Sequence, residues 1–309
     1  MKLNGNVVSK NSFWRRCIKQ RYLIMMVLPG FVLMLVFKYF PMYGILIAFK
    51  DFNAMDGILR SPWAGLKHFQ AFFDSPMSWR IIKNTLLLGL YSLIFGFPAP
   101  IVFALLLNEL RITLFKRAVQ TITYFPHFLS TVIIVGFVHE FASMDGIINH
   151  VMGWFGVDPV PLLNFSANFR SLFIGSSIWQ ELGWGAIIYL AAITGADSAL
   201  YEAAVIDGAN RWQRIRYVTW PAIVPATTVM LIMKLGSILS TDFQKVLLMY
   251  NPNIYETADV IETYVYRLGI MGTQYEYSSA VGLMLSLIAF VLITSGNYIS
   301  KKVSENSLW

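Results

Sequence analysis

Residues 200–221, LYEAAVIDGANRWQRIRYVTWP, form a polar interval between two apolar stretches of the chain. Asp197 and Ser198, just ahead of it, can cap a helix because a side-chain oxygen accepts a hydrogen bond from an unpaired backbone N–H. Residues 199–206 favour that helix, and Gly208 ends it, since glycine adopts left-handed backbone angles at low cost. Three arginines follow at helical spacing, Arg211, Arg214 and Arg216. The interval predicts a short helix, a glycine break and a basic second helix at a membrane surface, although an ordinary amphipathic connector would share this pattern.

The composition is that of a membrane protein. Of 309 residues, 56% are apolar and 13% are charged, with a mean hydropathy of +0.57, whereas soluble domains carry about 25% charged residues. The excess of seven positive charges lies at the ends of apolar segments, so we expect no nucleic-acid partner. A single cysteine, Cys17, excludes an internal disulfide and a thiolate metal cluster. No small-residue cleavage site follows the basic start and first apolar run, which predicts a retained first span.

Six apolar stretches are long enough to cross a bilayer as helices. We expect spans at 22–40, 84–107, 119–138, 169–193, 221–247 and 277–299. Pro126 and His127 interrupt the third stretch, which predicts a kink there. The chain is thus predicted to be an all-α membrane protein in which residues 22–300 form a six-helix domain. An N-terminal arm (1–21) and a short tail (301–309) flank that domain.

The distribution of Lys and Arg predicts the orientation of these spans. Fourteen of them fall in the four segments on one side, and five fall in the three segments on the other. Cytoplasmic segments are enriched in Lys and Arg. Both termini and the loop 197–220 are therefore expected in the cytoplasm, while residues 41–80, 139–168 and 248–277 are expected outside.

The loop carries a family motif. Glu202-Ala203-Ala204, Asp207-Gly208-Ala209 and Pro221 resemble the EAA loop of ABC-importer permeases, E-A-A-x-x-D-G-A with a proline about a dozen residues later. Three further stretches are similar to the sugar-importer branch of that family: LPGFVLMLVFKYFPMYG at 28–44, KNTLLLG at 83–89 and SIWQELGW at 177–184. The likeness covers nearly the whole chain. It departs at Asp197 and Ser198, where many relatives carry Ile-Pro, and either pair can open a helix.

The resemblance implies the type I ABC importer permease fold and a coupling helix that docks into a groove on an ATPase. It assigns coupling roles to Tyr201, Glu202, Ala203, Ala204, Asp207, Gly208, Ala209, Arg211 and Pro221. It also implies four kinds of partner: a second homologous permease, ATP-binding subunits, an extracytoplasmic solute-binding protein and membrane lipid. The substrate is expected to be a carbohydrate. By analogy with one branch of the family, it is expected to be an oligosaccharide derived from plant or algal polysaccharides. The expected location is the bacterial cytoplasmic membrane, which the chain crosses several times.

No catalytic, cofactor or metal site is expected in this chain. It has no Gly-rich loop ending in Gly-Lys-Ser or Gly-Lys-Thr, so ATP and Mg²⁺ are expected to bind to the partner ATPase. The four histidines lack metal-ligand spacing. A membrane enzyme, such as an intramembrane hydrolase, would need a nucleophile and a base at suitable depth, and the only clear charges within the spans are Glu181 and Lys234. The alternative function is a self-sufficient, ion-coupled secondary transporter, but the internal repeat typical of many such proteins is absent from the sequence.

Two ionisable residues fall in the middle of predicted spans, Glu181 in the fourth and Lys234 in the fifth. A charge at that depth costs about 2.5–3.5 kcal/mol on insertion scales, so each needs a partner or a wet cavity. Either the two neutralise each other inside the bundle or they line the solute path. Helical spacing places Ser177, Glu181, Trp184 and Ile188 on one face, and Thr227, Met230, Lys234, Ser237 and Thr241 on another. We expect a substrate path lined by Trp179, Glu181, Trp184, Lys234 and Ser237, where a lysine would suit an acidic sugar.

Overall fold

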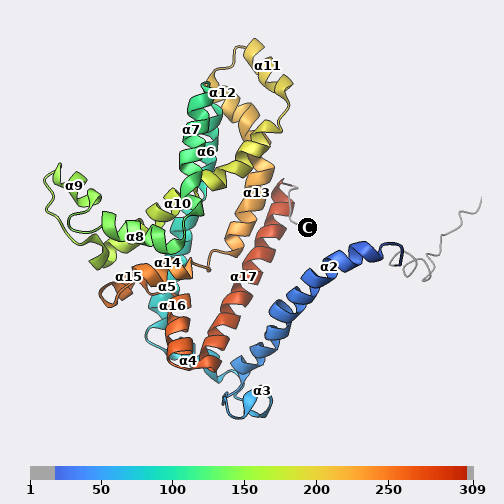
Figure 1. Cartoon of the computed structure of the whole chain (residues 1–309), viewed down its shortest axis with the longest axis vertical. Coiled ribbons are helices and arrows are strands. Elements are labelled where there is room, and N and C mark those ends of the chain that lie inside the picture. The colour runs from blue at the N-terminus through green and yellow to red at the C-terminus, as the bar shows by residue number, and fades with distance from the viewer. Residues whose placement is uncertain (1–17, 305–309) are drawn as a thin grey trace, which may run out of the picture.

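The computed structural model describes residues 18–304, and nearly all of them lie in helices (Figure 1). Most of the predicted N-terminal arm, including Cys17, and the end of the tail lie outside the described residues. The α-helices are α2 (Arg21–Met34), α3 (Gly57–Arg60), α4 (Lys67–Asp74), α5 (Ser78–Tyr91), α6 (Pro98–Asn108), α7 (Thr113–Tyr124), α8 (Thr131–Phe141), α9 (Ile147–Gly153), α10 (Ser166–Thr194), α11 (Ser198–Ile206), α12 (Arg211–Arg214), α13 (Trp220–Gly236), α14 (Phe243–Met249), α15 (Tyr255–Ala258), α16 (Ile261–Val265) and α17 (Tyr275–Ser304).

Several of these helices join into longer membrane-spanning segments. Four are long and apolar enough to cross a membrane, Arg21–Phe49, Ser78–Asn108, Arg211–Gly236 and Tyr275–Tyr298. Two bent pairs raise the number to six if each counts as one span. In the first pair, Thr113–Phe128 meets Thr131–Phe141 at 104°, which confirms the predicted kink beside Pro126 and His127. In the second pair, α10 meets α11 at 73°.

The ends predicted for the first and fifth spans differ most from the structure. The first span was expected to end at residue 40, but helical turns continue through the 3₁₀ segment η2 (Phe40–Phe49), whose proline lies in its first turn, where a missing N–H is tolerated. The fifth was expected to reach residue 247, but α13 ends at Gly236, so Lys234 lies in its last turn and not in the middle of the span. A Cβ at Gly236 would lie 2.1 Å from Ile293 Cγ1, so α13 and α17 approach each other closely at the end of α13. Asp242 then caps the separate helix α14.

Helix α10 is the centre of the bundle, packing against α6, α7, α13 and α15. One buried cluster joins α10 to α14 and includes Phe169, Phe173 and Val246. A second cluster joins α10 to α6 and includes Ala104 and Ala186. These aromatic and aliphatic side chains fill the space between the helices, as close-packed interiors require. Helix α2 differs, because none of its residues is buried and it stands apart from the other helices (Figure 1).

The connecting loop lies at one end of the molecule. Helix α11 lies at the end of the long axis opposite to α3 and α4 (Figure 1). It follows directly from α10 and leads through α12 and the π-helical segment η6 (Ile215–Thr219) into α13. The two helices that carry Glu181 and Lys234 are therefore joined by the loop that carries the EAA-like motif.

Candidate functional site

The EAA-like loop has the local structure that the sequence predicts. The Oδ1 of Asp197 accepts a hydrogen bond from the Ala199 N–H at 2.9 Å, which caps α11. Gly208 follows α11 with a φ of +75°, a left-handed conformation that favours glycine. A second cap was not predicted: the side chains of Asn210 and Gln213 each accept from the other residue's N–H, at 2.9 and 2.8 Å. This reciprocal cap starts the basic helix α12.

Most of the predicted coupling residues are available to a partner. Six of them are exposed: Glu202, Ala203, Asp207, Gly208, Arg211 and Pro221. The other three, Tyr201, Ala204 and Ala209, are half-buried. The hydroxyl of Tyr201 lies 3.0 Å from Thr219 Oγ1, to which it donates a hydrogen bond. Since Thr219 is buried at the end of η6, this bond fastens α11 to the start of α13. The coupling role of all nine residues stays a prediction.

The predicted substrate-path residues Glu181, Lys234 and Ser237 meet in the bundle. Two cavities, of about 470 and 300 Å³, share a wall formed by Ser92, Ser177, Glu181, Lys234 and Ser237. These volumes are in the range that small-molecule sites occupy. The lining mixes polar groups with apolar side chains such as Met230 and Tyr189. The cavities can therefore hold a polar ligand against both hydrogen-bonding and apolar surfaces.

The direct partner of Glu181 is His127, a residue that was not expected at this site. The Nδ1 of His127 lies 3.1 Å from Glu181 Oε2, and the imidazole stacks on Trp184 with ring centroids 4.4 Å apart. Lys234 makes no ion pair with Glu181 within the described residues. A direct ion pair of Glu181 with Lys234 is therefore absent, although the two charges lie close enough to interact electrostatically. The sequence feature that could have drawn attention to His127 is Pro126, because the proline places His127 at a helix break.

The two tryptophans of the predicted path lie in different places. Trp184 stacks on His127, the partner of Glu181. It also meets Phe128 edge-on, with the centroids of these two rings 5.7 Å apart. Trp179 instead lines a separate cavity of about 310 Å³ between α8 and α10, edge-on to Phe137. The structure thus brings Trp184 to the site but not Trp179, because the side chains at these positions leave α10 in different directions.

A buried lysine behind the cavity wall was also missed. Lys245 has 1% of its surface exposed, and its Nζ donates a hydrogen bond to Ser177 Oγ at 3.0 Å. The sequence placed it near the end of the fifth span with no role. Its contact with Ser177 joins residues 68 positions apart, so no local pattern could have found it.

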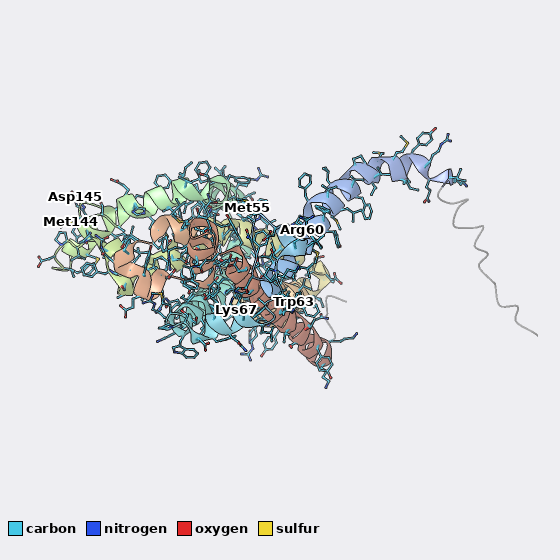
Figure 2. All side chains as sticks on the ribbon, turned by 90° about the horizontal axis from the view of Figure 1, so that it is seen from below. Met55, Arg60, Trp63, Lys67, Met144 and Asp145 are labelled. Atoms are coloured by element: carbon cyan, nitrogen blue, oxygen red, sulfur yellow. The ribbon has the colours of Figure 1, made fainter. Side chains whose placement is uncertain are left out.

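The opposite end of the molecule presents an exposed surface built by residues 50–74. Met55, Arg60, Trp63 and Lys67 lie on it, while Met144 and Asp145, in the turn between α8 and α9, lie apart at the left edge of the view (Figure 2). The side chains of Met55 and Trp63 are 95% and 66% exposed. The Nζ of Lys67 donates to Asp51 at 2.7 Å, and this hydrogen bond lowers the pKa of Asp51. Within residues 18–304 no group of three or more His, Cys, Asp or Glu side chains is arranged to hold a metal.

The family of the chain follows from residues 85–305, which match the model of the binding-protein-dependent transport system inner membrane component. The chain belongs to this family. The permease is 44% identical, over 95% of its length and 92% of the relative's, to the polygalacturonan/rhamnogalacturonan transport system permease YteP of Bacillus subtilis. It is 41% identical to the LplB protein of the same organism, over 97% and 95% of the two chains.

Solved structures agree with this family. One chain in the crystal structure of a bacterial ABC transporter that imports the acidic polysaccharide alginate is 42% identical to the permease, with a TM-score of 0.88. The match covers 95% of the permease and 99% of that chain. An equal TM-score is found for the alginate transporter in complex with its alginate pentasaccharide-bound periplasmic protein. The protein is therefore the permease component of an ABC importer for sugars or oligosaccharides, and it spans the bacterial inner membrane.

Proposed function

We propose that this permease forms, with a second homologous permease, the membrane path of an importer for acidic oligosaccharides. Two ATP-binding subunits would drive it, binding ATP and Mg²⁺, and an extracytoplasmic solute-binding protein would deliver the substrate. The observation that carries the proposal is that one loop joins both walls of the cavity. Helix α10 contributes Glu181 to one wall, and helix α13 contributes Lys234 to the other. The EAA-like loop, which begins with α11, connects these two helices.

This connection supports coupling by alternating access. Closure of ATP-bound ATPases against α11 would move the adjoining ends of α10 and α13 together, because Tyr201 and Thr219 fasten the loop to η6. The cavity would then open alternately to the two sides of the membrane. Rigid secondary elements of this kind can carry coupling between the site of ATP binding and the walls that move.

The orientation that we propose has six spans with both termini in the cytoplasm. Two observations support it: the two bent helix pairs bring the number of candidate spans to six, with α10 as the membrane part of the second pair, and the excess of Lys and Arg lies on the side of α11. In this arrangement α11 meets the ATPase. The exposed surface with Met55 and Trp63 would meet the solute-binding protein (Figure 2). The apolar helix α2, which buries none of its residues within this chain, would be covered by lipid and by the partner permease.

The acidic substrate is supported by charge in the cavity and by the relatives. Lys234 lines both cavities, and no carboxylate of the described residues lies within ion-pair distance of it. Glu181 is already engaged by His127. The ammonium group is therefore available to a carboxylate, with which it forms a strong charge-assisted hydrogen bond. Two of the relatives named above transport or import polymers of uronic acids, polygalacturonan and alginate.

Uptake by the reconstituted complex tests this function. Proteoliposomes containing both permeases and the ATP-binding subunits would receive the loaded binding protein outside and ATP inside. We expect uptake of labelled trigalacturonate and much slower uptake of a neutral trisaccharide of the same length. Uptake that persists without the ATP-binding subunits would favour the ion-coupled secondary transporter instead. Equal uptake of acidic and neutral trisaccharides would contradict the substrate class alone.

A further inference from the structure

Lys245 is a buried cation with few partners. Its side chain lies on α14 with 1% of the residue exposed, and no carboxylate of the described residues lies within ion-pair distance of its Nζ. The ammonium lies 5.6 Å from the centre of the Phe173 ring and donates to Ser177. Burial of an ammonium without an ion-pair partner is unfavourable, and an apolar residue of similar size would avoid that penalty. A lysine at this position therefore points to a role beyond packing.

The two hydrogen bonds of Ser177 determine whether its hydroxyl can donate to a ligand or only accept from it. The Oγ–H donates to the Phe173 carbonyl oxygen at 2.7 Å, because a carbonyl can only accept. The same Oγ accepts from Lys245 Nζ at 3.0 Å, because an ammonium can only donate. A serine hydroxyl has one proton and two lone pairs, so a single lone pair is left. Ser177 lines both cavities, where that lone pair can accept one more hydrogen bond.

We propose that Lys245 is a positioning residue that fixes Ser177 as a hydrogen-bond acceptor for a hydroxyl group of the transported sugar. A sugar carboxylate cannot bind at Ser177 in this state, since two acceptors would face each other. It binds instead at Lys234, which shares the cavity wall with Ser177. The cavity thus distinguishes the two kinds of polar group on an acidic sugar. This inference rests on the proposed function, because it assigns the groups of the acidic oligosaccharide to residues of the same cavity.

A double-mutant cycle tests whether Lys245 acts through Ser177. Uptake of labelled trigalacturonate is measured with the complete complex carrying Ser177→Ala, Lys245→Met or both. Loss of one neutral hydrogen bond predicts about fivefold slower uptake for each single variant. The double variant should be no slower than Ser177→Ala, because both changes remove the same interaction. Ser286→Ala is the matched control: Ser286 also donates to a carbonyl one turn back, that of Gly282, but it lies outside these cavities.

A second readout separates positioning from structural support. O-acetylated trigalacturonate has lost hydroxyl donors, so wild-type uptake should favour the unmodified sugar. This preference should shrink about fivefold in Lys245→Met and in Ser177→Ala, but not in Ser286→Ala. Discrimination by the binding protein cancels, because the same binding protein is used throughout. Co-purification with the second permease and thermal unfolding report assembly of each variant.

The outcomes are distinct. The positioning role would be overturned if the two substitutions slowed uptake multiplicatively in the double variant. It would also be overturned if Lys245→Met kept the wild-type preference for unmodified over O-acetylated trigalacturonate. If Lys245→Met does not assemble, the preference of Ser177→Ala decides, and an unchanged preference there also overturns the inference. Failure of the wild-type complex to take up trigalacturonate would instead contradict the proposed function.

Discussion

The Nδ1 of His127 lies 3.1 Å from the Glu181 carboxylate, although 54 residues separate them in the chain. His127 lies in the last turn before the break between α7 and α8, where the two helical halves meet at 104°. Glu181 lies near the middle of α10 and lines the cavity. This contact holds the cavity's acid against the bend of the neighbouring span, and Trp184 stacks on the imidazole from α10.

Substitution of His127 should separate the hydrogen bond from the stacking. His127→Phe keeps a ring for Trp184 but frees the Glu181 carboxylate, and we expect about fivefold slower initial uptake. His127→Ala also loses the stacking, worth about 0.5–1.5 kcal/mol, so its uptake should be slower still. His139→Phe is the control, because the hydrogen bond of His139 goes to the carbonyl of Leu248, at 3.3 Å, and not to the cavity. Equal uptake by wild type and His127→Phe would show that the contact is dispensable.

Exchange of the two charges should not restore transport. Glu181→Lys places an ammonium beside His127, and Lys234→Glu removes the cation offered to the substrate. The swapped double variant would restore function only if the two charges serve each other, whereas the direct partner of Glu181 is His127. We expect its uptake to stay far below that of wild type while it still co-purifies with the second permease. Full recovery in the double variant would refute the substrate-path assignment of both residues.

The sequence predicted features set by neighbouring residues and missed those set by distant ones. The Asp197 cap, the left-handed Gly208 and the break beside Pro126 each depend on a few adjacent residues, and all three are present. The close approach of Ile293 of α17 to Gly236 and the His127–Glu181 and Lys245–Ser177 contacts all join separate helices. Apolar residues continue through 41–47 and recur among the polar residues of 237–247, so hydropathy could not locate the ends of the first and fifth spans.

Gly208 should be needed for its backbone conformation. Its φ is +75°, and a Cβ added there would meet no atom within 4 Å beyond the neighbouring residues, so space does not limit substitution. Gly208→Val should therefore act through backbone strain of about 1–2 kcal/mol or more, which would redirect α12 and weaken ATPase docking. Gly208→Asn should retain transport, because asparagine tolerates this conformation. Uptake and recovery of the ATP-binding subunits would be measured together, and normal values for the valine variant would contradict the coupling assignment.

Cysteine labelling in intact cells should reveal the orientation. In a Cys17→Ser background, single cysteines replace four exposed residues, Thr113, Asn164, Asn210 and Asn253. A membrane-impermeant thiol reagent should label the probes at Asn164 and Asn253 and spare those at Thr113 and Asn210. Permeabilised cells provide the control, because all four side chains are exposed and should then react. Labelling of the Asn210 probe from outside would overturn the cytoplasmic position of α11.

A structure of the complete complex with a trapped acidic oligosaccharide tests the central claim most directly. An ATPase variant that binds but does not hydrolyse ATP would hold the substrate inside the membrane path. We predict density for the sugar in the cavity between α10 and α13, with a carboxylate within hydrogen-bond distance of Lys234 and a hydroxyl at Ser177. A sugar bound only to the partner permease, or in the separate cavity beside Trp179, would contradict the assignment.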